Sequence, residues 1–563
     1  MKRSERQSRT LSILALTTAI LLIVPNALLI FSERQNPITA ILSILFPFSV
    51  YLLVISLWKR TGWGVLSTLP FMILAAFQIV LLYLYGESII AVDMFINVTT
   101  TDVQEATTLL EQLTPAIIVV IALYLPPLIW AVISLYGNKS TINHYRRILL
   151  LYWSVILFTL SGISLLVCSI LGSVAPGNDI FPINVIRNIA IAVERVNDAN
   201  GYPESAQDYT FNATIKPEIT PDSTGRIIIA VIGETARADR WQLYGFNRET
   251  NPRLSERNGL VTMQRPVTQS NTTHKSVPML LTALTAETFD QLPKTKSFIT
   301  AFKEAGYSTA FFSNQPPNRS YNQHLGEEAD TTFFFERNIS EATNKDVQLA
   351  DLTASWIAQD TSRLQLIVLH TYGAHFPYTD HYTPEQAVFL PDSPLSAKSS
   401  NRENLLNAYD NATIAVDLAL DSLISVLNAQ KRPGALIYAG DHGEDIFDDN
   451  RGKFLHASPI PTAWQIYVPM IVWTSPGLLS ESQTDALHNN AKELQSPSET
   501  FFHTVIDLGG IATPVFKSNQ SLISDSFQAA PMIYINDRNQ SLKLSESGLR
   551  DNDLQQLKEW NIE

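Results

Sequence analysis

Five apolar segments in the first third of the chain constrain its fold more than any other feature. Each is about twenty residues long and contains no Asp, Glu, Lys or Arg, and together they cover residues 11–31, 38–58, 65–85, 117–135 and 149–171. A helix of about twenty apolar residues can cross the hydrocarbon core of a bilayer, where it satisfies its own backbone hydrogen bonds. We therefore predict a transmembrane domain of five helices over residues 1–172.

The charges in the loops predict how these helices are oriented. Lys and Arg gather before the first apolar segment, between the second and third, and between the fourth and fifth, whereas the alternate loops hold only Arg34. Cytoplasmic loops are the basic ones, so the N-terminus is expected in the cytoplasm. The first segment is long for a signal peptide and lacks a small-residue cleavage site, which favours an anchor. After five crossings, the rest of the chain is expected on the far side of the membrane, which is the periplasm if the protein comes from a double-membraned bacterium and spans its inner membrane.

Two connecting regions have patterns of their own. The acidic loop of residues 86–114, expected in the periplasm, spaces Asn97, Thr101 and Glu105 four residues apart, which places them on one face of a helix. The spacing alone favours a solvated helix face over a binding face. Residues 173–225 form a predicted linker that contains "FPINVIRNIAIAVERV", whose apolar residues follow a helical period. This helix either lies at the membrane interface or packs on the soluble domain.

Residues 226–563 alternate short runs rich in Val, Ile and Leu with amphipathic stretches. Strands buried on both faces of a sheet have such runs, so we predict an α/β domain with a largely parallel sheet. In these sheets, ligands bind beyond the carboxyl ends of the strands. Four of the runs end in polar residues that are therefore expected to share one crevice: Glu234 and Thr235; Asn314 and Gln315; His370 and His375; Asp441, His442 and Glu444.

The residue types limit the chemistry of this crevice. The chain has one cysteine, so an intrachain disulfide or a cysteine-rich metal site cannot form, and Asp, Glu, His or hydroxyl groups must hold any metal. Such ligands suit Zn²⁺ in a catalytic site, and His456 in "KFLHASP" adds a further imidazole. A formal charge of -13 without a clustered basic tract argues against nucleic acid as a partner.

A stretch rich in hydroxyl groups offers a nucleophile. "TQSNTTHKSVPMLLTA" places Ser270, Thr272, Thr273 and Ser276 just before an apolar helical segment. A hydroxyl at a helix N-terminus faces backbone N–H groups that stabilise phosphate, and a metal can deprotonate it. N-capping is the structural alternative, but it accounts for one hydroxyl and not for four.

These motifs together resemble a known family. "GETARADRWQLYGFNRETNPRL", "SNTTHKSVPMLLT", "LHTYGAHFPYTDHYT", "YAGDHGEDIF" and "FLHASP" follow five apolar segments in this order. They are similar to the phosphoethanolamine transferases of the Gram-negative envelope, which are membrane members of the alkaline phosphatase superfamily. The resemblance covers nearly the whole chain. It implies an alkaline-phosphatase-like fold for the soluble domain and Zn²⁺ as cofactor, with one tightly bound ion and room for a second.

The same resemblance implies roles for individual residues. Thr273 would be the nucleophile, and the metal ligands would be Glu234, Thr273, Asp441 and His442. His375 and His456 are expected to bind the substrate phosphate, carry protons or hold a second zinc ion. The spacing of Asn97, Thr101 and Glu105 matches a family set that contacts the lipid head group, which reverses the preference for a solvated face. Further substrate-binding residues would be Asn314, Gln315 and Arg319 in "FFSNQPPNRS".

The implied reaction transfers phosphoethanolamine from the membrane lipid phosphatidylethanolamine, through a covalent intermediate on Thr273, to lipopolysaccharide. Lipid A transferases of the family commonly have several disulfides, which this chain cannot form, so core heptose is the preferred acceptor and lipid A the second. The alternative is a phosphoglycerol transferase or a membrane-anchored phosphatase or other hydrolase of the superfamily. A sulfatase would need a Cys/Ser-x-Pro-x-Arg stretch, which is absent near Thr273. A non-catalytic sensor would be expected to have lost one of the site residues.

Overall fold

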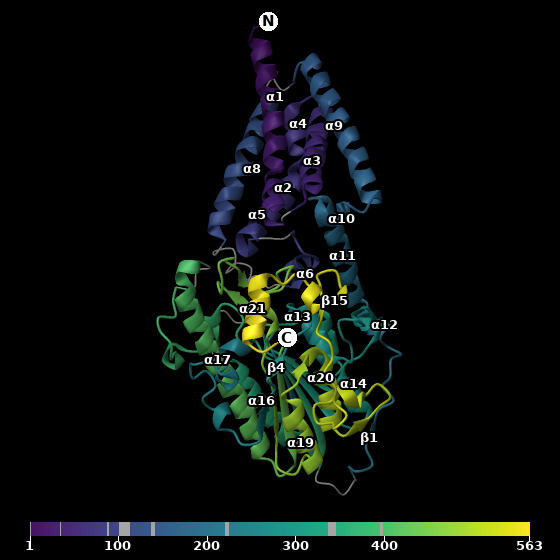
Figure 1. The fold of residues 1–563 in the computed structure, drawn as a ribbon, viewed down its shortest axis with the longest axis vertical. Helices are drawn as coiled ribbons and strands as arrows, with labels where there is room; N and C mark the ends of the chain where they lie inside the picture. Colours follow the sequence, from purple (N-terminus) through teal and green to yellow (C-terminus); the bar gives the residue numbers. More distant parts are fainter. Residues whose placement is uncertain are drawn as a thin grey trace. The chain divides into compact units, whose positions relative to one another are not determined.

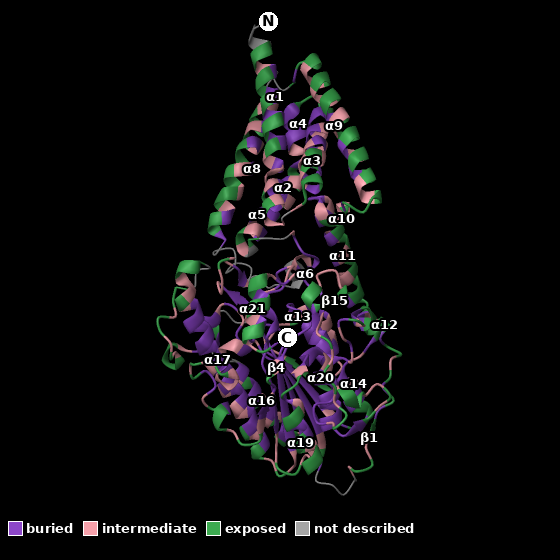
Figure 2. Ribbon diagram, viewed as in Figure 1, coloured by how far each residue is buried: buried purple, intermediate pink, exposed green. Residues whose placement is uncertain are grey.

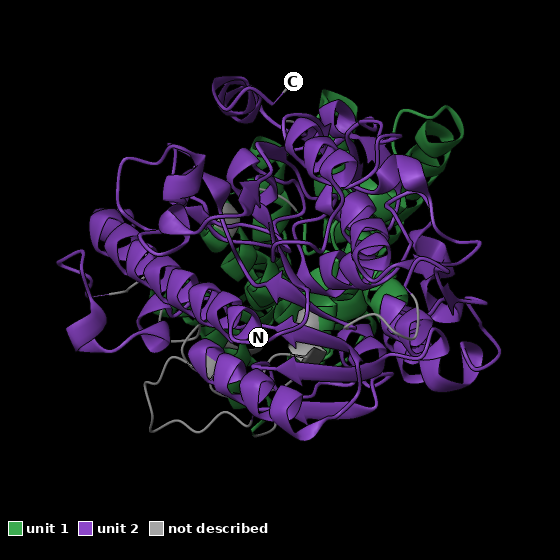
Figure 3. Ribbon diagram, turned by 90° about the horizontal axis from the view of Figure 1, so that it is seen from below, with its two compact units in different colours: residues 1–193 green, residues 194–563 purple. Residues whose placement is uncertain are grey.

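The chain folds into two compact units, and its structure is a computed structural model. Unit 1 covers Met1–Val193 and unit 2 covers Glu194–Glu563 (Figure 3). The boundary falls inside one helix, α11 (Ile183–Asn200). The structure describes residues 2–33, 35–86, 89–100, 113–136, 141–219, 225–335, 345–394 and 398–562.

Unit 1 is helical throughout its described elements. Buried apolar side chains of α1, α3, α5 and α8, among them Leu14, Tyr51, Met72 and Tyr124, form its core. The described helices are α1 (Lys2–Leu22), α2 (Val24–Ser32), α3 (Pro37–Leu57), α4 (Thr61–Leu66), α5 (Leu69–Tyr85), α6 (Val92–Thr100), α8 (Thr114–Leu135), α9 (His144–Ile170), α10 (Pro176–Asp179) and the first part of α11.

Among the described residues of unit 1, four helical stretches are long and apolar enough to cross a membrane, namely Glu5–Ser32, Pro37–Leu57, Thr114–Leu135 and His144–Ile170. The third apolar segment, residues 65–85, was predicted to be one helix. The structure instead divides it, because α4 ends at Leu66 and α5 begins at Leu69. The break lies just before Pro70, because a proline has no N–H to donate to the carbonyl of Leu66 four residues earlier and its ring crowds that carbonyl. The resulting α5 has 17 residues and is a shorter apolar helix.

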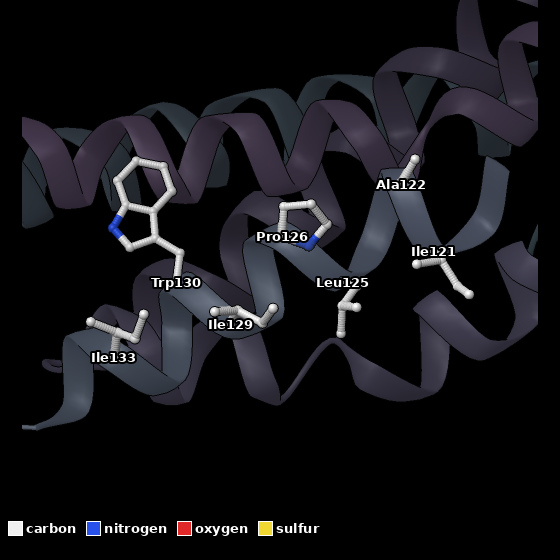
Figure 4. Close-up of a pocket in the computed structure, with 7 residues that line it drawn as sticks. All are labelled: Ile121, Ala122, Leu125, Pro126, Ile129, Trp130 and Ile133. Atoms are coloured by element: carbon white, nitrogen blue, oxygen red, sulfur yellow. The ribbon is translucent and has the colours of Figure 1, made fainter. Parts of the chain in front are cut away.

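The outward faces of α8 and α9 are apolar. Figure 2 shows exposed and half-exposed residues along both helices, and they include large side chains such as Ile133 and Leu166. Two prolines, Pro126 and Pro127, lie inside α8. The first of them borders an open apolar recess (Figure 4) lined by Ile121, Ala122, Leu125, Pro126, Ile129, Trp130 and Ile133. Apolar surface of this extent is expected of helices that contact lipid.

Polar side chains fix the start of α11 within unit 1. The Nδ2 of Asn188 donates to the Ile90 carbonyl at 2.8 Å, and the Nδ2 of Asn26 donates to the Phe181 carbonyl at 2.7 Å. Val185 on α11 is buried in the core of this unit. Residues 183–200 of the predicted linker are therefore helical and partly packed, and a position of α11 at a membrane surface stays a prediction.

Unit 2 is built around a seven-stranded sheet with the strand order β3-β11-β8-β2-β7-β5-β6. The pairs β8–β2, β2–β7, β7–β5 and β5–β6 are parallel, whereas β11 is antiparallel to both β8 and β3. The prediction of a largely parallel sheet is confirmed. The strands are β2 (Arg226–Gly233), β3 (Leu260–Thr262), β5 (Ser308–Ser313), β6 (Thr331–Phe334), β7 (Leu364–His370), β8 (Gly434–Gly440) and β11 (Met470–Thr474).

Helices cover both faces of this sheet (Figure 1). Successive residues of β2 point to opposite faces. Thus Ile228 packs with α13 (Thr273–Leu281), α14 (Phe298–Glu304) and α20 (Pro497–Leu508), while Ile229 packs with α16 (Lys345–Gln359) and α17 (Arg402–Asn428). Both side chains are fully buried. Burial on both faces explains why these strands read as continuous apolar runs in the sequence.

Short elements complete unit 2 and connect its layers. They are α12 (Tyr202–Ser205), α15 (Tyr321–Gly326), α18 (Ala463–Ile466), α19 (Glu481–Asn490) and α21 (Asp551–Glu559), with β1 (Thr214–Ile215), β4 (Arg265–Pro266), β9 (Asp445–Ile446), β10 (Phe454–Leu455), β12 (Leu494–Gln495), β13 (Ile511–Ala512), β14 (Ile533–Ile535) and β15 (Ser541–Lys543).

Candidate metal centre

The register of the sheet brings the polar strand ends to one edge. Ile232 of β2 pairs with His370 of β7, and Gly233 pairs with Gly440 of β8. Backbone hydrogen bonds continue past the strands, because the Asp441 N–H donates to the Gly233 carbonyl at 2.8 Å and the Asn314 N–H donates to the His370 carbonyl at 2.9 Å. The residues that follow β2, β5, β7 and β8 therefore lie side by side.

Four side chains converge at this edge. Thr273, the first residue of α13, places its Oγ1 3.2 and 3.4 Å from the two carboxylate oxygens of Glu234 and 3.0 Å from Nε2 of His442. The same Nε2 lies 3.3 Å from Oδ2 of Asp441 and 3.5 Å from Oε1 of Glu234. Glu234, Asp441 and His442 are buried. The structure thus brings together all four residues that were predicted to hold a metal.

The charges of this cluster fit a bound cation. Burial raises the pKa of Asp441 well above its usual range, and the neighbouring carboxylate of Glu234 raises it further. Burial opposes ionisation of Glu234 as well, but the surrounding histidines, His442 first, hold the pKa of Glu234 below its usual value. Two buried carboxylates so close together repel each other unless a proton or a cation lies between them. Carboxylate, hydroxyl and imidazole donors match the ligands that Zn²⁺ accepts in catalytic sites.

His456 borders the same cluster. Its nitrogen lies within 4.8 Å of ligand atoms of Glu234 and His442, and its ring centroid is 4.2 Å from that of His442. The β9–β10 hairpin pairs Asp445 with Leu455, which places His456 near Glu444, whose Oε2 is 3.6 Å from its Nδ1. Burial, with the nearby His442, lowers the pKa of His456 to about 4. The imidazole is therefore neutral at neutral pH and able to ligate a metal or accept a proton.

His375 lies beyond His456. The two ring centroids are 5.7 Å apart. Nδ1 of His375 is 2.7 Å from the Phe376 carbonyl and 3.0 Å from the Tyr372 hydroxyl, so these contacts hold the ring. Of the two histidines with predicted catalytic roles, His456 thus lies next to the four converging side chains, and His375 lies against His456.

The predicted substrate-binding residues after β5 are placed differently. The Nδ2 of Asn314 donates to Oδ1 of Asp346 at 2.7 Å, and the Nε2 of Gln315 donates to Oε2 of Glu234 at 2.8 Å. Arg319 is exposed, and its backbone N–H donates to Oε1 of Gln323 at 2.6 Å. The first two side chains are therefore engaged by the protein, and the third lies at the surface.

The other predicted substrate residues belong to unit 1. Asn97 lies in α6, whereas Thr101 and Glu105 fall outside the described residues. A role for this group in binding a lipid head group stays a prediction.

Sequence reasoning missed Asp346. Its Oδ1 accepts from Asn314 and from the Tyr372 N–H at 3.0 Å, and its Oδ2 accepts from the Gly373 N–H at 2.9 Å. It is buried, which raises its pKa to about 6. Asp346 therefore joins the segment after β5 to the segment after β7. Nothing in "KDVQLADL" marks this role, because it depends on the order of the strands in the sheet.

The comparisons with known proteins agree with this fold. The sulfatase family model matches residues 226–511. The Kdo(2)-lipid A phosphoethanolamine 7''-transferase of Salmonella typhimurium is 26% identical over 342 residues, which are 58% of this chain and 58% of that protein. The chain thus matches somewhat more than half the length of this relative.

Two solved structures share the fold. The integral membrane protein lipooligosaccharide phosphoethanolamine transferase A from Neisseria meningitidis has a TM-score of 0.68 at 19% identity and covers 92% of this chain and 98% of its own. The C-terminal periplasmic domain of EcEptC from Escherichia coli, in a complex with Zn, has a TM-score of 0.52 at 24% identity and covers 58% of this chain and 94% of its own. The family match extends over half of the chain and includes Glu234, Thr273, Asp441 and His442, so the chain belongs to the sulfatase family.

Proposed function

We propose that this protein transfers phosphoethanolamine from phosphatidylethanolamine to a lipopolysaccharide acceptor. The observation that carries the proposal is the position of the Thr273 hydroxyl, 3.0 to 3.4 Å from the imidazole of His442 and the carboxylate of Glu234. A similar relative bears the name of a phosphoethanolamine transferase. Membership of the sulfatase family does not imply sulfate ester hydrolysis, because one fold supports several reactions.

Each residue of the site has a role in this reaction. Glu234, Asp441, His442 and Thr273 would hold Zn²⁺. When bound, the ion would lower the pKa of the threonine hydroxyl and screen the charge on the phosphoryl oxygens. The N-terminus of α13, where Thr273 lies, adds backbone N–H groups that favour an anionic phosphate.

The reaction has two displacements. The Oγ1 of Thr273 bonds to the phosphorus of the lipid head group, the bond from phosphorus to the diacylglycerol oxygen breaks, and diacylglycerol leaves with a proton. An acceptor hydroxyl then bonds to the same phosphorus, loses its proton, and releases Thr273. The ring of His456 lies against that of His442, which contacts the Thr273 hydroxyl, and the ring of His375 lies against that of His456. We therefore assign His456 and His375 proton transfer and phosphate binding.

The acceptor and the site of action follow from the same proposal. Among lipopolysaccharide acceptors we favour core heptose over lipid A, because the single cysteine excludes the disulfides common in lipid A transferases. The apolar helices of unit 1, with α5 as a fifth and shorter crossing, would hold the protein in the inner membrane, with unit 2 in the periplasm. Asn97, Thr101 and Glu105 would contact the head group of the donor.

Donor specificity tests the proposal directly. The purified full-length protein is incubated with labelled phosphatidylethanolamine or phosphatidylglycerol, and released diacylglycerol is measured. Release from phosphatidylethanolamine supports the proposal, and release from phosphatidylglycerol alone supports a phosphoglycerol transferase. Turnover that needs no acceptor and yields free phosphoethanolamine indicates a hydrolase. Mass spectrometry of lipopolysaccharide from cells with and without the gene then locates the added group on core heptose or lipid A.

A further inference from the structure

The two carboxylate oxygens of Glu234 have different surroundings. Oε1 accepts from the Thr235 hydroxyl at 2.9 Å and lies near Thr273 and His442. Oε2 accepts from Nε2 of Gln315 at 2.8 Å. The Thr273 hydroxyl lies 3.2 Å from Oε1 and 3.4 Å from Oε2, so Oε1 is the oxygen nearer to the nucleophile and the one that faces the imidazole, while a neutral amide holds Oε2.

The amide of Gln315 can take only one orientation. Its Nε2 donates to Oε2 of Glu234 and also lies 3.3 Å from the Thr371 carbonyl oxygen. Both partners are acceptors, so a flipped amide would place its own oxygen against two oxygens. Gln315 is thus a hydrogen-bond donor toward Glu234, fixed by a backbone group of the neighbouring strand end.

The segment that carries Gln315 is itself held in place. Asn314 is buried and donates to Asp346, which also accepts the N–H groups of Tyr372 and Gly373. Gly373 has a φ of 55°, and a Cβ there would collide with the Glu234 carbonyl oxygen. The segments after β5, β7 and β2 are therefore packed closely enough to fix the distance from Gln315 to Glu234.

A second buried group faces the same oxygen. Nε2 of His370 lies 3.9 Å from Oε2 of Glu234. This nitrogen is buried and, within the described ranges, has no hydrogen-bond partner. At 3.9 Å it does not bond to the carboxylate, and the Thr273 hydroxyl is 3.4 Å away, so the 2.8 Å bond from Gln315 is the shortest of these contacts with Oε2.

We propose that Gln315 is a positioning residue that holds Oε2 of Glu234 and thereby turns Oε1 toward the metal, rather than a residue that binds the substrate. The inference rests on the proposed function for the identity of the metal site. An outer hydrogen-bond partner orients a metal ligand before the ion binds, and its loss typically weakens metal binding about 10- to 100-fold. Gln315 acts through Glu234 and does not touch the reacting atoms.

Zinc binding measures this role without any lipid. Full-length Gln315→Met, which keeps the length of the side chain but removes the donor, is compared with Gln323→Met on the same segment. Gln323 lies in α15, where its side chain bonds to the Arg319 N–H and to Glu327, and neither bond involves Glu234. Competition with a chelator should show about 10- to 100-fold weaker zinc binding for Gln315→Met. Gln323→Met should bind zinc like the unmodified protein.

Two further measurements distinguish a positioning role of Gln315 from a direct contact with the substrate. At saturating zinc, Gln315→Met should keep the KM for phosphatidylethanolamine and change kcat. In a chelator the variant should still unfold in one cooperative transition, which shows that it folds. Unchanged zinc affinity, with or without a raised KM, would overturn the inference, and the raised KM would make Gln315 a substrate contact. If the unmodified protein lacks transferase activity but Gln315→Met still weakens zinc binding, the proposed function fails and the positioning role stands.

Discussion

Replacement of Arg237 by methionine should destabilise unit 2, because its guanidinium is buried and fully engaged. The side chain is 1% exposed. It donates to Asp239 at 3.0 and 2.7 Å, to Asp448 at 2.8 and 3.1 Å, and to the Glu444 carbonyl at 3.1 Å. The substitution removes all of these bonds and leaves Asp448, which is 5% exposed, with one fewer cation.

These contacts determine how much Arg237→Met should lower the free energy of unfolding. Breaking a buried ion pair by removing one partner costs about 3–5 kcal/mol. Arg402 remains 3.5 Å from Asp448, and Asp239 is 13% exposed, so the lower end of that range applies. The unfolding entropy of about 2.1 cal/mol/K per residue, applied to residues 194–563, converts about 3 kcal/mol into a melting temperature about 4 °C lower.

Thermal unfolding of the full-length protein in detergent with excess zinc measures this effect. Arg253→Met is the matched control, since Arg253 is exposed, and it should melt like the unmodified protein. A double-mutant cycle with Asp448→Asn isolates the pairwise contribution, because the two effects should be less than additive. A melting temperature for Arg237→Met within about 1 °C of the unmodified protein would refute this reasoning.

Three further changes should have measurable effects. Asp346→Ala leaves the donors of Asn314, Tyr372 and Gly373 without this acceptor, and those of Asn314 and Gly373 are buried. It should therefore lower the unfolding free energy by about 1–3 kcal/mol in a denaturant titration, and an unchanged midpoint would contradict this. Burial, with nearby Lys517, lowers the pKa of His503 to about 4. Between about pH 6.5 and 4, the unfolded chain therefore binds a proton that the folded protein does not. The free energy of unfolding should fall by up to about 3 kcal/mol as the pH falls through this range. His503→Gln should flatten that part of the stability profile, and an identical slope would exclude His503 as its cause. Chelation should abolish diacylglycerol release and lower the melting temperature, and zinc, but not magnesium, should restore both, because the ligand set includes imidazole.

The sequence contains enough to predict the sheet and the residues at its edge. The runs of β2 and β8 are apolar without alternation, as strands covered on both faces must be, and the polar residues that follow them are Glu234, Asp441 and His442. The types of these side chains predict, without any structure, a metal site with oxygen and nitrogen ligands. The prediction of Thr273 as the nucleophile needed more than residue types, because Ser270, Thr272 and Ser276 lie close to it and only the family resemblance distinguishes Thr273 from them.

Other features depend on tertiary structure that the sequence does not display. The insertion of β7 between β2 and β5 gives Asp346 and Gln315 their partners, and strand order leaves no local pattern. Asn314 and Gln315 lie at a strand end as predicted, yet their side chains bond to the protein. The boundaries of α4 and α5 follow from Pro70, which hydropathy alone does not register.

A covalent intermediate on Thr273 is the most direct test of the central claim. The full-length protein, loaded with zinc, is mixed with phosphatidylethanolamine without acceptor, quenched in acid and digested for mass spectrometry. The account predicts a phosphoethanolamine group on the peptide that contains Thr273, absent in Thr273→Val and present in Thr272→Val, since the hydroxyl of Thr272 contacts Ser270 and not the metal cluster. Diacylglycerol release from phosphatidylethanolamine by Thr273→Val at the unmodified rate, or an adduct on another residue, would contradict it.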